Sequence, residues 1–403
     1  MIDALPAYSV ALQRFEDTLN CLEQETIAWR HAFGRVLAED VTARFDFPAY
    51  NQASFEGYAV KASDLVGATP QAPKTLTCIT SREQIPNPNH PELPQNSALK
   101  VEAGAPIPEG ANAVVRLQQC QLVDDQVQIN LAPQPMKNIR RRAEEIRAGM
   151  VILQAGETID SAHLGLLLSQ GIEEVAAYQR PKVAIISRGH DAQLSARTPI
   201  QAYMLEAELS RLGVESSQVE ATSGSVEQFA QTLAASAQEN GFVIVCGGVS
   251  FESDDDFVQA LHQLNADIHL QGVAVEPGAP FTYAQYQGVP IMGLPHHAIA
   301  AMTAYHILVK PALRRVMGKT EWRNPTGFAR SGALLHNPEK RSSFVRARLT
   351  HSPTGMPIAF PTGQQNSTML TSLLNADCFI VIPPDIGTLE EFGETEFMPI
   401  TRS

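Results

Sequence analysis

The pattern of apolar and polar positions is clearest between residues 180 and 318. The short apolar runs KVAIIS, FVIVC and VPIM predict buried strands. Amphipathic runs between and after them predict helices, the longest of which is HHAIAAMTAYHILVKPALRRVMG. Because apolar strands that alternate with helices are typical of a parallel sheet covered on both faces, we expect an α/β domain at 180–318.

The N-terminal part predicts two different modules. Residues 3–40 carry apolar positions every three or four residues, which predicts helix with Ser9 as the cap. Between 46 and 135, short runs such as TLTCIT and QVQINL alternate with turns, which predicts an inserted β-rich domain.

Two further segments complete the predicted organisation. Residues 136–179 are mixed, with a helix over SAHLGLLLSQG that ends at Gly171, and together with 1–45 they predict an N-terminal or linker domain. Residues 319–403 return to β-like runs such as FVRARLT and FIVIPP, which predict a small C-terminal β-barrel. The expected fold class is therefore multi-domain α/β plus β.

Composition narrows the functional classes. The chain has 403 residues, 44% of them hydrophobic, so it can bury a sizeable core. Its formal net charge of −13 argues against nucleic acid or a membrane surface as a general partner, but leaves room for a small anion in a local pocket. No leader or membrane-spanning run is visible, and the five cysteines are scattered, so we expect a reducing compartment, the cytoplasm.

Three loops of the α/β segment follow predicted strands. They are SRGHD, CGGVSFESDDD and GLPHHA, and in a parallel sheet such loops lie where ligands bind. Gly247 and Gly248 would let backbone amides approach an anion, although an isolated glycine pair more often only turns the chain. Three such loops together favour a ligand site.

The acidic run Asp254, Asp255 and Asp256 has two interpretations. Its carboxylates have the chemistry to bind Mg²⁺, or they stabilise the start of the following helix, which charge alone favours. His296 and His297 are adjacent, so their side chains point in different directions and are unsuited to hold one metal together. The sequence contains no zinc-site spacing, catalytic triad, Walker loop or GxGxxG motif.

Several segments, taken together, resemble one family. FPAYNQASFEGYAV, EAGAPIPEGANAVV, NIRRRAEEI, the pair CGGVS and EPGAPF, GLP, and PTGQQNSTMLTSLLNADCFIVIP occur in the order found in the molybdopterin molybdenumtransferase (MoeA/gephyrin E-domain) family. The resemblance spans nearly the whole chain.

This resemblance implies a function. Family enzymes insert molybdate into adenylylated molybdopterin and release AMP with the help of Mg²⁺, a step of molybdenum cofactor biosynthesis. The resemblance also implies a homodimer of four-domain subunits with a shared cleft, and partner proteins of the same biosynthesis. Such a transferase needs cationic and amide groups for its anions and carboxylates for the metal.

The chain departs from the family pattern at the loops that would bind these ligands. Glu56 replaces the acid of MDGYA, and the hydroxyl of TGAP is lost before Gly104. The acids of TGDEL are reduced to Asp191, and both lysines of KPGKPF are gone, with Glu276 in place of the first. Exchanging attraction for repulsion near a phosphate costs at least about 1–3 kcal/mol, and Arg188 or Arg346 are the candidates to replace part of the lost charge.

The candidate site combines these matches with the acidic run and the three loops described above. The candidate acids are Glu56, Asp191, Asp255 and Asp256, of which the last three are the candidate Mg²⁺ ligands. The candidate substrate-binding residues are Gly104, Gly247, Gly248, Ser250, Pro277, Gly278, Pro295, His296, Arg346 and Ser367.

Three functions remain open on the sequence. The first is an active molybdenumtransferase with a remodelled pocket. The second is a non-catalytic paralogue that binds a partner protein or a modified pterin. The third is a related enzyme that acts on another nucleotide-like substrate.

Overall fold

The chain forms two compact units, seen here in a computed structural model. The first unit comprises residues 1–39, 155–164 and 174–403, and the second comprises 40–154 and 165–173. The structure describes residues 5–80, 92–188, 200–220, 224–247, 249, 251, 255–351 and 355–400. The multi-domain α/β plus β class is confirmed, while the finer division into four domains stays a prediction.

The α/β part of the first unit is built on a six-stranded sheet of order β14-β13-β15-β19-β18-β16. Strands β14, β13, β15 and β19 are parallel, as predicted, whereas β18 pairs antiparallel with both β19 and β16, which makes the sheet mixed. The strands are β13 Lys182–Ser187, β14 Glu215–Glu220, β15 Phe242–Cys246, β16 Asp267–Gln271, β18 Thr282–Tyr286 and β19 Val289–Leu294.

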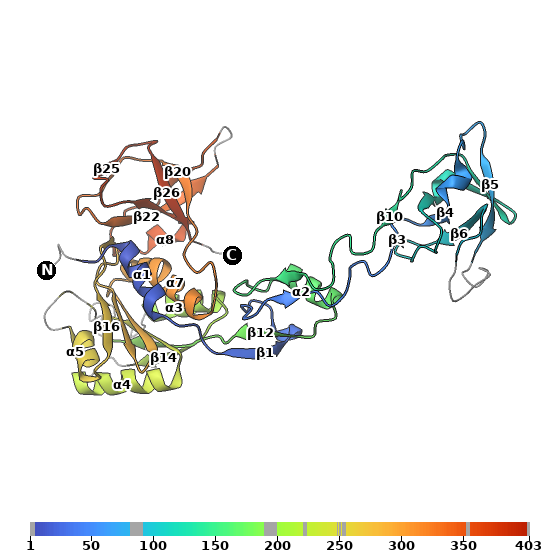
Figure 1. The fold of residues 1–403 in the computed structure, drawn as a ribbon. Coiled ribbons are helices and arrows are strands. Elements are labelled where there is room, and N and C mark those ends of the chain that lie inside the picture. The colour runs from blue at the N-terminus through green and yellow to red at the C-terminus, as the bar shows by residue number, and fades with distance from the viewer. Residues whose placement is uncertain are drawn as a thin grey trace. The chain divides into compact units, whose positions relative to one another are not determined.

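Helices cover both faces of this sheet (Figure 1). Alternate residues of β13 point to opposite sides: Val183 and Ile185 join the cluster that includes α1 and α3, and Ala184 and Ile186 join the cluster that includes α4 and α5. The helices are α1 Tyr8–Thr18, α3 Ile200–Arg211, α4 Val226–Glu239 and α5 Asp256–Gln263. This two-sided burial explains why the central strands are apolar throughout.

The predicted long helix is present and contains one irregular turn. It consists of α6 Ala298–Ala304, the π-helical turn η6 Tyr305–Val309 and α7 Lys310–Val316. Nearly every residue of the helix is buried, because it lies between the α/β sheet and the C-terminal region.

The C-terminal region is a closed barrel, as predicted. Strands β22, β23, β20, β26 and β24 pair in that order, and β22 also pairs with β24, which closes the ring. Short strand β17 extends the edge of β22. The elements are β17 Val275–Glu276, β20 Gly327–Ser331, β21 Leu335–His336, β22 Ser342–Thr350, β23 Ile358–Pro361, α8 Thr371–Leu374, β24 Cys378–Ile382, β25 Thr388–Leu389 and β26 Glu394–Pro399.

The predicted helix over 3–40 is wrong beyond Thr18. After α1 the chain forms β1 Gln24–Ala28, which pairs antiparallel with β12 Glu174–Tyr178, and then the 3₁₀ turn η2 Trp29–His31. A partner strand about 150 residues away overrides the local helical periodicity. Ser9 does not cap α1, because the helix begins at Tyr8, after Ala7, so Ser9 lies within the first turn and Ala7 provides no side-chain cap.

The second unit contains the predicted β-rich module. Its main sheet has six strands in the order β7-β4-β6-β5-β9-β8. The elements of this unit are β2 Val41–Thr42, β3 Gln52–Ala53, β4 Gly57–Val60, η3 Ala62–Leu65, β5 Lys74–Ile79, β6 Ser97–Val101, β7 Ala113–Arg116, η5 Leu117–Gln119, β8 Cys120–Val123, β9 Gln126–Ile129, β10 Ile139–Arg140 and β11 Val151–Leu153. Helix α2 Ser161–Ser169 begins in the first unit and ends in the second.

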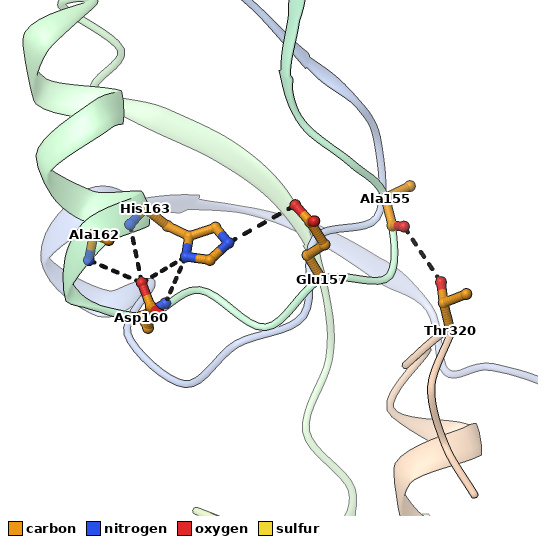
Figure 2. A network of polar contacts seen from close by, with 6 residues as sticks. All are labelled: Ala155, Glu157, Asp160, Ala162, His163 and Thr320. Carbon is orange, nitrogen blue, oxygen red and sulfur yellow. Dashed lines mark hydrogen bonds and ion pairs between the residues drawn. The ribbon is translucent and has the colours of Figure 1, made fainter. Parts of the chain in front are cut away.

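A polar network fixes the start of α2 (Figure 2). Asp160 Oδ1 accepts hydrogen bonds from the backbone amides of Ala162 and His163, at 2.8 and 3.0 Å, and lies 2.6 Å from His163 Nδ1. These contacts hold the pKa of the Asp160 carboxyl below its usual value. Glu157 lies 3.8 Å from the other ring nitrogen of His163, so the loop before α2 is held in place from both sides.

Candidate functional site

The three loops singled out in the sequence begin at one edge of the α/β sheet. Ser187, the last residue of β13, pairs with Cys246 at the end of β15, and Cys246 pairs with Leu294 at the end of β19. Arg188, Gly247 and Pro295 therefore follow three neighbouring strands at their carboxyl ends, where parallel sheets bind ligands.

Gly247 is needed by the close approach of two of these loops. Its φ of +82° favours glycine, and a Cβ there would lie 2.0 Å from the carbonyl oxygen of Arg188. The Arg188 amide donates a 2.8 Å hydrogen bond to the carbonyl of Cys246. Gly247 is thus a tight-turn residue, while Gly248 and Ser250, the rest of the predicted cradle, lie outside the described residues.

The Arg188 side chain is held by several groups. Its Nη2 lies 2.5 Å from Asp256 Oδ2 and donates a 3.2 Å hydrogen bond to the Gly224 carbonyl. Its guanidinium carbon lies 4.6 Å from the ring centroid of Phe229, a cation–π distance. Only 8% of the side chain is exposed, so Arg188 anchors the start of α5 and its charge is compensated by Asp256.

Asp255 is the N-cap of α5. Its Oδ1 accepts hydrogen bonds from the amides of Phe257 and Val258, at 2.9 and 3.2 Å, and the residue is 6% exposed. This is the capping arrangement that satisfies the first free amides of a helix. Of the two interpretations of the acidic run, the structure shows the capping contacts.

The described residues do not by themselves compose a magnesium site. In the part of the chain that the structure describes, no three His, Cys, Asp or Glu side chains are grouped as metal ligands. Asp255 caps a helix and Asp256 pairs with Arg188, while Asp191 lies outside the described residues. Binding of Mg²⁺ by these three acids stays a prediction.

The third loop of the edge is closely packed at its base. A Cβ on Gly293, within β19, would lie 2.4 Å from the Phe257 ring, so glycine lets α5 pack against the strand. Pro295 is buried, and His296 is exposed. The Gln201 side-chain amide donates to the His296 carbonyl, which ties the loop to α3. His296 and the neighbouring His297 are thus the exposed members of this loop.

Glu276 lies where β17 meets the barrel. The half-exposed carboxylate is 4.0 Å from Arg341, whose guanidinium also lies 3.7 Å from Glu339. Partial burial raises the pKa of the Glu276 carboxyl, and the charges of Arg341 and Arg346 oppose that rise. The negative charge at the position of the family's first lysine is therefore partly compensated by nearby arginines.

Pro277 and Gly278 continue from Glu276 and are both buried. Gly278 has a φ of +121°, a conformation that favours glycine. The two residues form the turn between β17 and the segment that leads into β18, so their buried position points to a role in shaping the loop.

Arg346 is a buried cation with neutral hydrogen-bond partners. Its Nε donates to Ser372 Oγ at 2.9 Å and its Nη2 donates to the Asn366 carbonyl at 3.3 Å. The residue is 1% exposed, and burial lowers its pKa to about 10, so it stays protonated at neutral pH. Among the described residues it has no carboxylate within ion-pair distance, and the charge of Glu276 acts on it only from farther away.

The loop that Arg346 binds carries Ser367. Ser372 Oγ also donates to the Met369 carbonyl at 2.7 Å, and Gln365 accepts from the Arg346 amide at 2.9 Å. Ser367 itself is half-buried. Arg346 thus holds this loop rather than facing open solvent. The sequence did not identify its partners Gln365, Asn366 and Ser372 as site residues, although all three stand in the motif PTGQQNSTMLTSLL.

Glu56 and Gly104 lie on two loops of the second unit. Glu56 is exposed just before β4, where a Cβ on Gly57 would lie 2.0 Å from the Val115 carbonyl oxygen. The exposed Gly104, with a φ of +81°, donates its amide to the Ala53 carbonyl at 2.8 Å. The MDGYA-like and TGAP-like loops are therefore neighbours within this unit.

Comparison with known families covers most of the chain. Residues 7–171 match the MoeA N-terminal region (domain I and II), residues 184–315 match a probable molybdopterin binding domain, and residues 329–399 match the MoeA C-terminal region (domain IV). The three matches occur in the order predicted from the loop motifs.

The similarity to curated relatives covers nearly the full length of the chain. A protein of Mycobacterium tuberculosis, molybdopterin molybdenumtransferase 2, is 31% identical over 376 residues, which cover 90% of this chain and 91% of the relative. The chain belongs to the molybdopterin molybdenumtransferase family. Another member of the family, from Haemophilus influenzae, is 28% identical over 93% of both chains.

A solved structure agrees with this molybdopterin molybdenumtransferase fold. The molybdopterin biosynthesis MoeA protein from Pyrococcus horikoshii superposes with a TM-score of 0.77 at 23% identity, and the match covers 99% of this chain and 100% of the other. Within the described residues, no helix has the length and apolar character needed to cross a membrane.

Proposed function

We propose that the protein is a molybdopterin molybdenumtransferase, which inserts molybdate into adenylylated molybdopterin and releases AMP in molybdenum cofactor biosynthesis. The observation that carries the proposal is the 31% identity to a curated molybdenumtransferase over about nine-tenths of both chains. The neighbouring loops at the carboxyl ends of β13, β15 and β19 support it, since ligands of parallel sheets bind at this edge.

Two arginines support anion binding by the first unit. Arg346 keeps a positive charge that no carboxylate within ion-pair distance compensates in the described residues, and a buried charge acts on a ligand over a longer range than an exposed one. Arg341 weakens the repulsion from Glu276. Arg346 is a positioning residue here, because it is buried under the loop that carries Ser367.

Magnesium is part of the proposal through Asp191, which the family resemblance assigns, and through the acidic run that contains Asp255 and Asp256. Mg²⁺ favours carboxylate oxygens and neutralises the charge of phosphate groups. Of the two described candidate ligands, Asp255 caps α5, and Asp256 would have to share its carboxylate with Arg188. Asp191 is the third candidate and lies outside the described residues.

The assembly and compartment are also proposals. The family resemblance supports a homodimer, with partner proteins from molybdenum cofactor biosynthesis, and sedimentation of the purified chain would measure its mass. All five cysteines are free, which supports a reducing compartment such as the cytoplasm.

The proposed activity can be measured directly. Purified protein is mixed with adenylylated molybdopterin and Mg²⁺, with or without molybdate, and AMP is quantified over one turnover. We expect stoichiometric AMP release that depends on molybdate. Tight binding without AMP release would support the non-catalytic paralogue, which the comparisons do not favour, and the absence of binding would refute the proposal.

The same assay addresses the related enzyme with another substrate. If a different adenylylated compound released AMP while adenylylated molybdopterin did not, that third function would replace the proposed one. Lys182→Gln, a change at an exposed lysine that begins β13, serves as a matched control for charge substitutions in the first unit.

A further inference from the structure

A basic pocket lies at the C-terminal end of α7, in the first unit. The cavity has a volume of about 520 Å³ and is lined in part by Arg314, Lys319, Arg323 and Trp322. One carboxylate, Glu321, also lines it. Three cationic side chains and one carboxylate therefore line the pocket, which makes it locally positive. The chain as a whole has a formal net charge of −13.

The turn that ends α7 brings two of these cations together. The Lys319 amide donates to the Arg314 carbonyl at 3.0 Å, and the Gly318 amide donates to the Arg315 carbonyl at 2.9 Å. This pair of bonds is a Schellman motif, with Gly318 at a φ of +81°. The motif fixes the backbone positions of Arg314 and Lys319 next to each other, so the fold itself brings both side chains to the same pocket.

The cations of the pocket are only partly compensated. Arg314 Nη1 donates to Asn324 Oδ1 at 3.1 Å, a neutral partner, and Arg323 pairs with Glu16 at 2.7 Å. Among the described side chains, neither Arg314 nor Lys319 has a carboxylate within ion-pair distance. Burial and the charge of Arg314 lower the pKa of Lys319, which is the expected result for like charges that share a site.

The walls of the pocket are held in place before any ligand binds. Thr320 Oγ1 donates to the Ala155 carbonyl at 3.4 Å, as Figure 2 shows, and the Thr320 amide donates to the Gly156 carbonyl at 3.3 Å. A Cβ on Gly156 would lie 1.9 Å from Thr320 Oγ1. Trp322 is 5% exposed, and the guanidinium of Arg323 lies 5.0 Å from its ring.

We propose that this pocket binds a small phosphorylated compound through its tetrahedral oxyanion. A phosphate group carries two negative charges near neutral pH and accepts several charge-assisted hydrogen bonds, which suits converging lysine and arginine side chains. The cavity volume falls in the range of sites for small organic ligands and exceeds the needs of an inorganic ion. The pocket is separate from the loops at the sheet edge, so this proposal does not rest on the proposed transferase activity.

Protection of Lys319 from acetylation tests the proposal at the site itself. The full chain is treated with an acetylating reagent in the presence of increasing inorganic phosphate, and each lysine is quantified by peptide mass spectrometry. Because a bound oxyanion holds the ammonium form, we expect about tenfold slower acetylation of Lys319 at saturating phosphate. The exposed Lys182 is the internal control and should be modified at an unchanged rate.

Parallel titrations with AMP and with molybdate distinguish the sources of the oxyanion. Protection by AMP at a lower concentration than by phosphate would support a phosphorylated organic ligand. Better protection by molybdate, or equal acetylation of Lys319 with and without every anion, would overturn the proposal.

A pair of variants checks the same pocket by calorimetry. The double variant Lys319→Gln/Arg323→Gln changes two partly exposed side chains that line the pocket, and it should weaken phosphate binding about tenfold or more. The variant Arg330→Gln, at an exposed arginine of β20, should bind phosphate as the parent does. Equal affinity in the double variant and the parent would contradict the proposal.

Discussion

Arg188 and Arg346 are both buried arginines of the first unit, but their partners differ. Arg188 pairs with the carboxylate of Asp256 at 2.5 Å, at the edge of the α/β sheet. Arg346 donates to Ser372 and to the Asn366 carbonyl, in the barrel, and these partners are neutral. The first charge is compensated locally, whereas the second, within the part of the chain that the structure describes, is opposed by the more distant Glu276.

This difference indicates different roles. A compensated ion pair contributes to the fold but offers little attraction to an anion, because its field is cancelled at short range. A buried charge with neutral partners costs desolvation free energy and keeps its field. We infer that Arg188 mainly stabilises the start of α5, and that Arg346 supplies the positive potential and the loop position that anionic substrates need.

Replacing Arg346 by methionine should have the largest effect on activity. The Arg346→Met variant loses the charge and the hydrogen bonds to Ser372 and Asn366, and we expect kcat/KM for AMP release to fall at least ~30-fold, about 2 kcal/mol. Single-turnover kinetics of folded protein measures this loss.

The conservative variant Arg346→Lys separates the charge from the geometry. Lysine keeps the positive charge but cannot reproduce the arginine's two donors in one plane. We expect it to restore a large part of kcat/KM, and equal losses in both variants would show that the loop position alone matters.

Replacing Arg188 by methionine should affect stability more than activity. The variant leaves Asp256 without its guanidinium, but this carboxylate is 43% exposed and can rehydrate, so we expect a loss of about 1–3 kcal/mol in the free energy of unfolding. Urea denaturation measures the loss. A fall in kcat/KM as large as that of Arg346→Met would remove the distinction between the two arginines.

Neutralising Glu276 should lower KM, an effect smaller than the losses expected for the two arginine variants. The Glu276→Gln variant removes a negative charge near the cationic groups of β22, and we expect KM for adenylylated molybdopterin to fall about fivefold, near 1 kcal/mol. An unchanged or higher KM would indicate that Glu276 lies away from the bound anion or supports Arg341.

The same variant has a predicted pH dependence. Because burial raises the pKa of Glu276 in the folded protein, the folded state holds this proton more tightly than the unfolded state. Stability from this group is therefore present at low pH and is lost as pH rises from the unfolded pKa of about 4.5 through the raised folded value. The glutamine variant lacks this loss, so its stability relative to the parent should increase between pH 4 and 7, as thermal unfolding would show.

Replacing Asp255 should have the smallest effect, a change of about 1 kcal/mol or less in the free energy of unfolding. Asparagine caps helices as well as aspartate, so Asp255→Asn should leave stability within about 0.5 kcal/mol, whereas Asp255→Ala should lose about 1 kcal/mol. Denaturation curves distinguish the two variants. A tenfold higher Mg²⁺ requirement for AMP release in Asp255→Asn would show that the carboxylate binds the metal, as the sequence predicted, in addition to capping α5.

The fold was largely predictable where the local pattern and the tertiary structure agree. The strands KVAIIS and FVIVC and the helices α3 to α5 are apolar on the faces they bury, so their sequence carries the signal. The exceptions depend on distant partners: β1 pairs with β12, and β16 pairs with β18 at the antiparallel edge of the sheet. No local periodicity encodes such pairings.

The candidate site was predictable in its loops but not in its contacts. Glycines at tight turns, such as Gly247, could be found because few other residues fit there. The pairing of Asp256 with Arg188 could not be predicted, because these residues are 68 positions apart and meet only in the folded chain. The burial of Arg346 could not be predicted either, because it depends on how the barrel loop folds over the side chain.

Calorimetric titration of the Arg188→Met and Arg346→Met variants with adenylylated molybdopterin tests the central claim most directly. We predict that Arg188→Met binds within about threefold of the parent affinity, because its charge is already compensated, and that Arg346→Met binds at least ~10-fold more weakly. Equal affinities in the two variants, or a greater loss in Arg188→Met, would contradict the account.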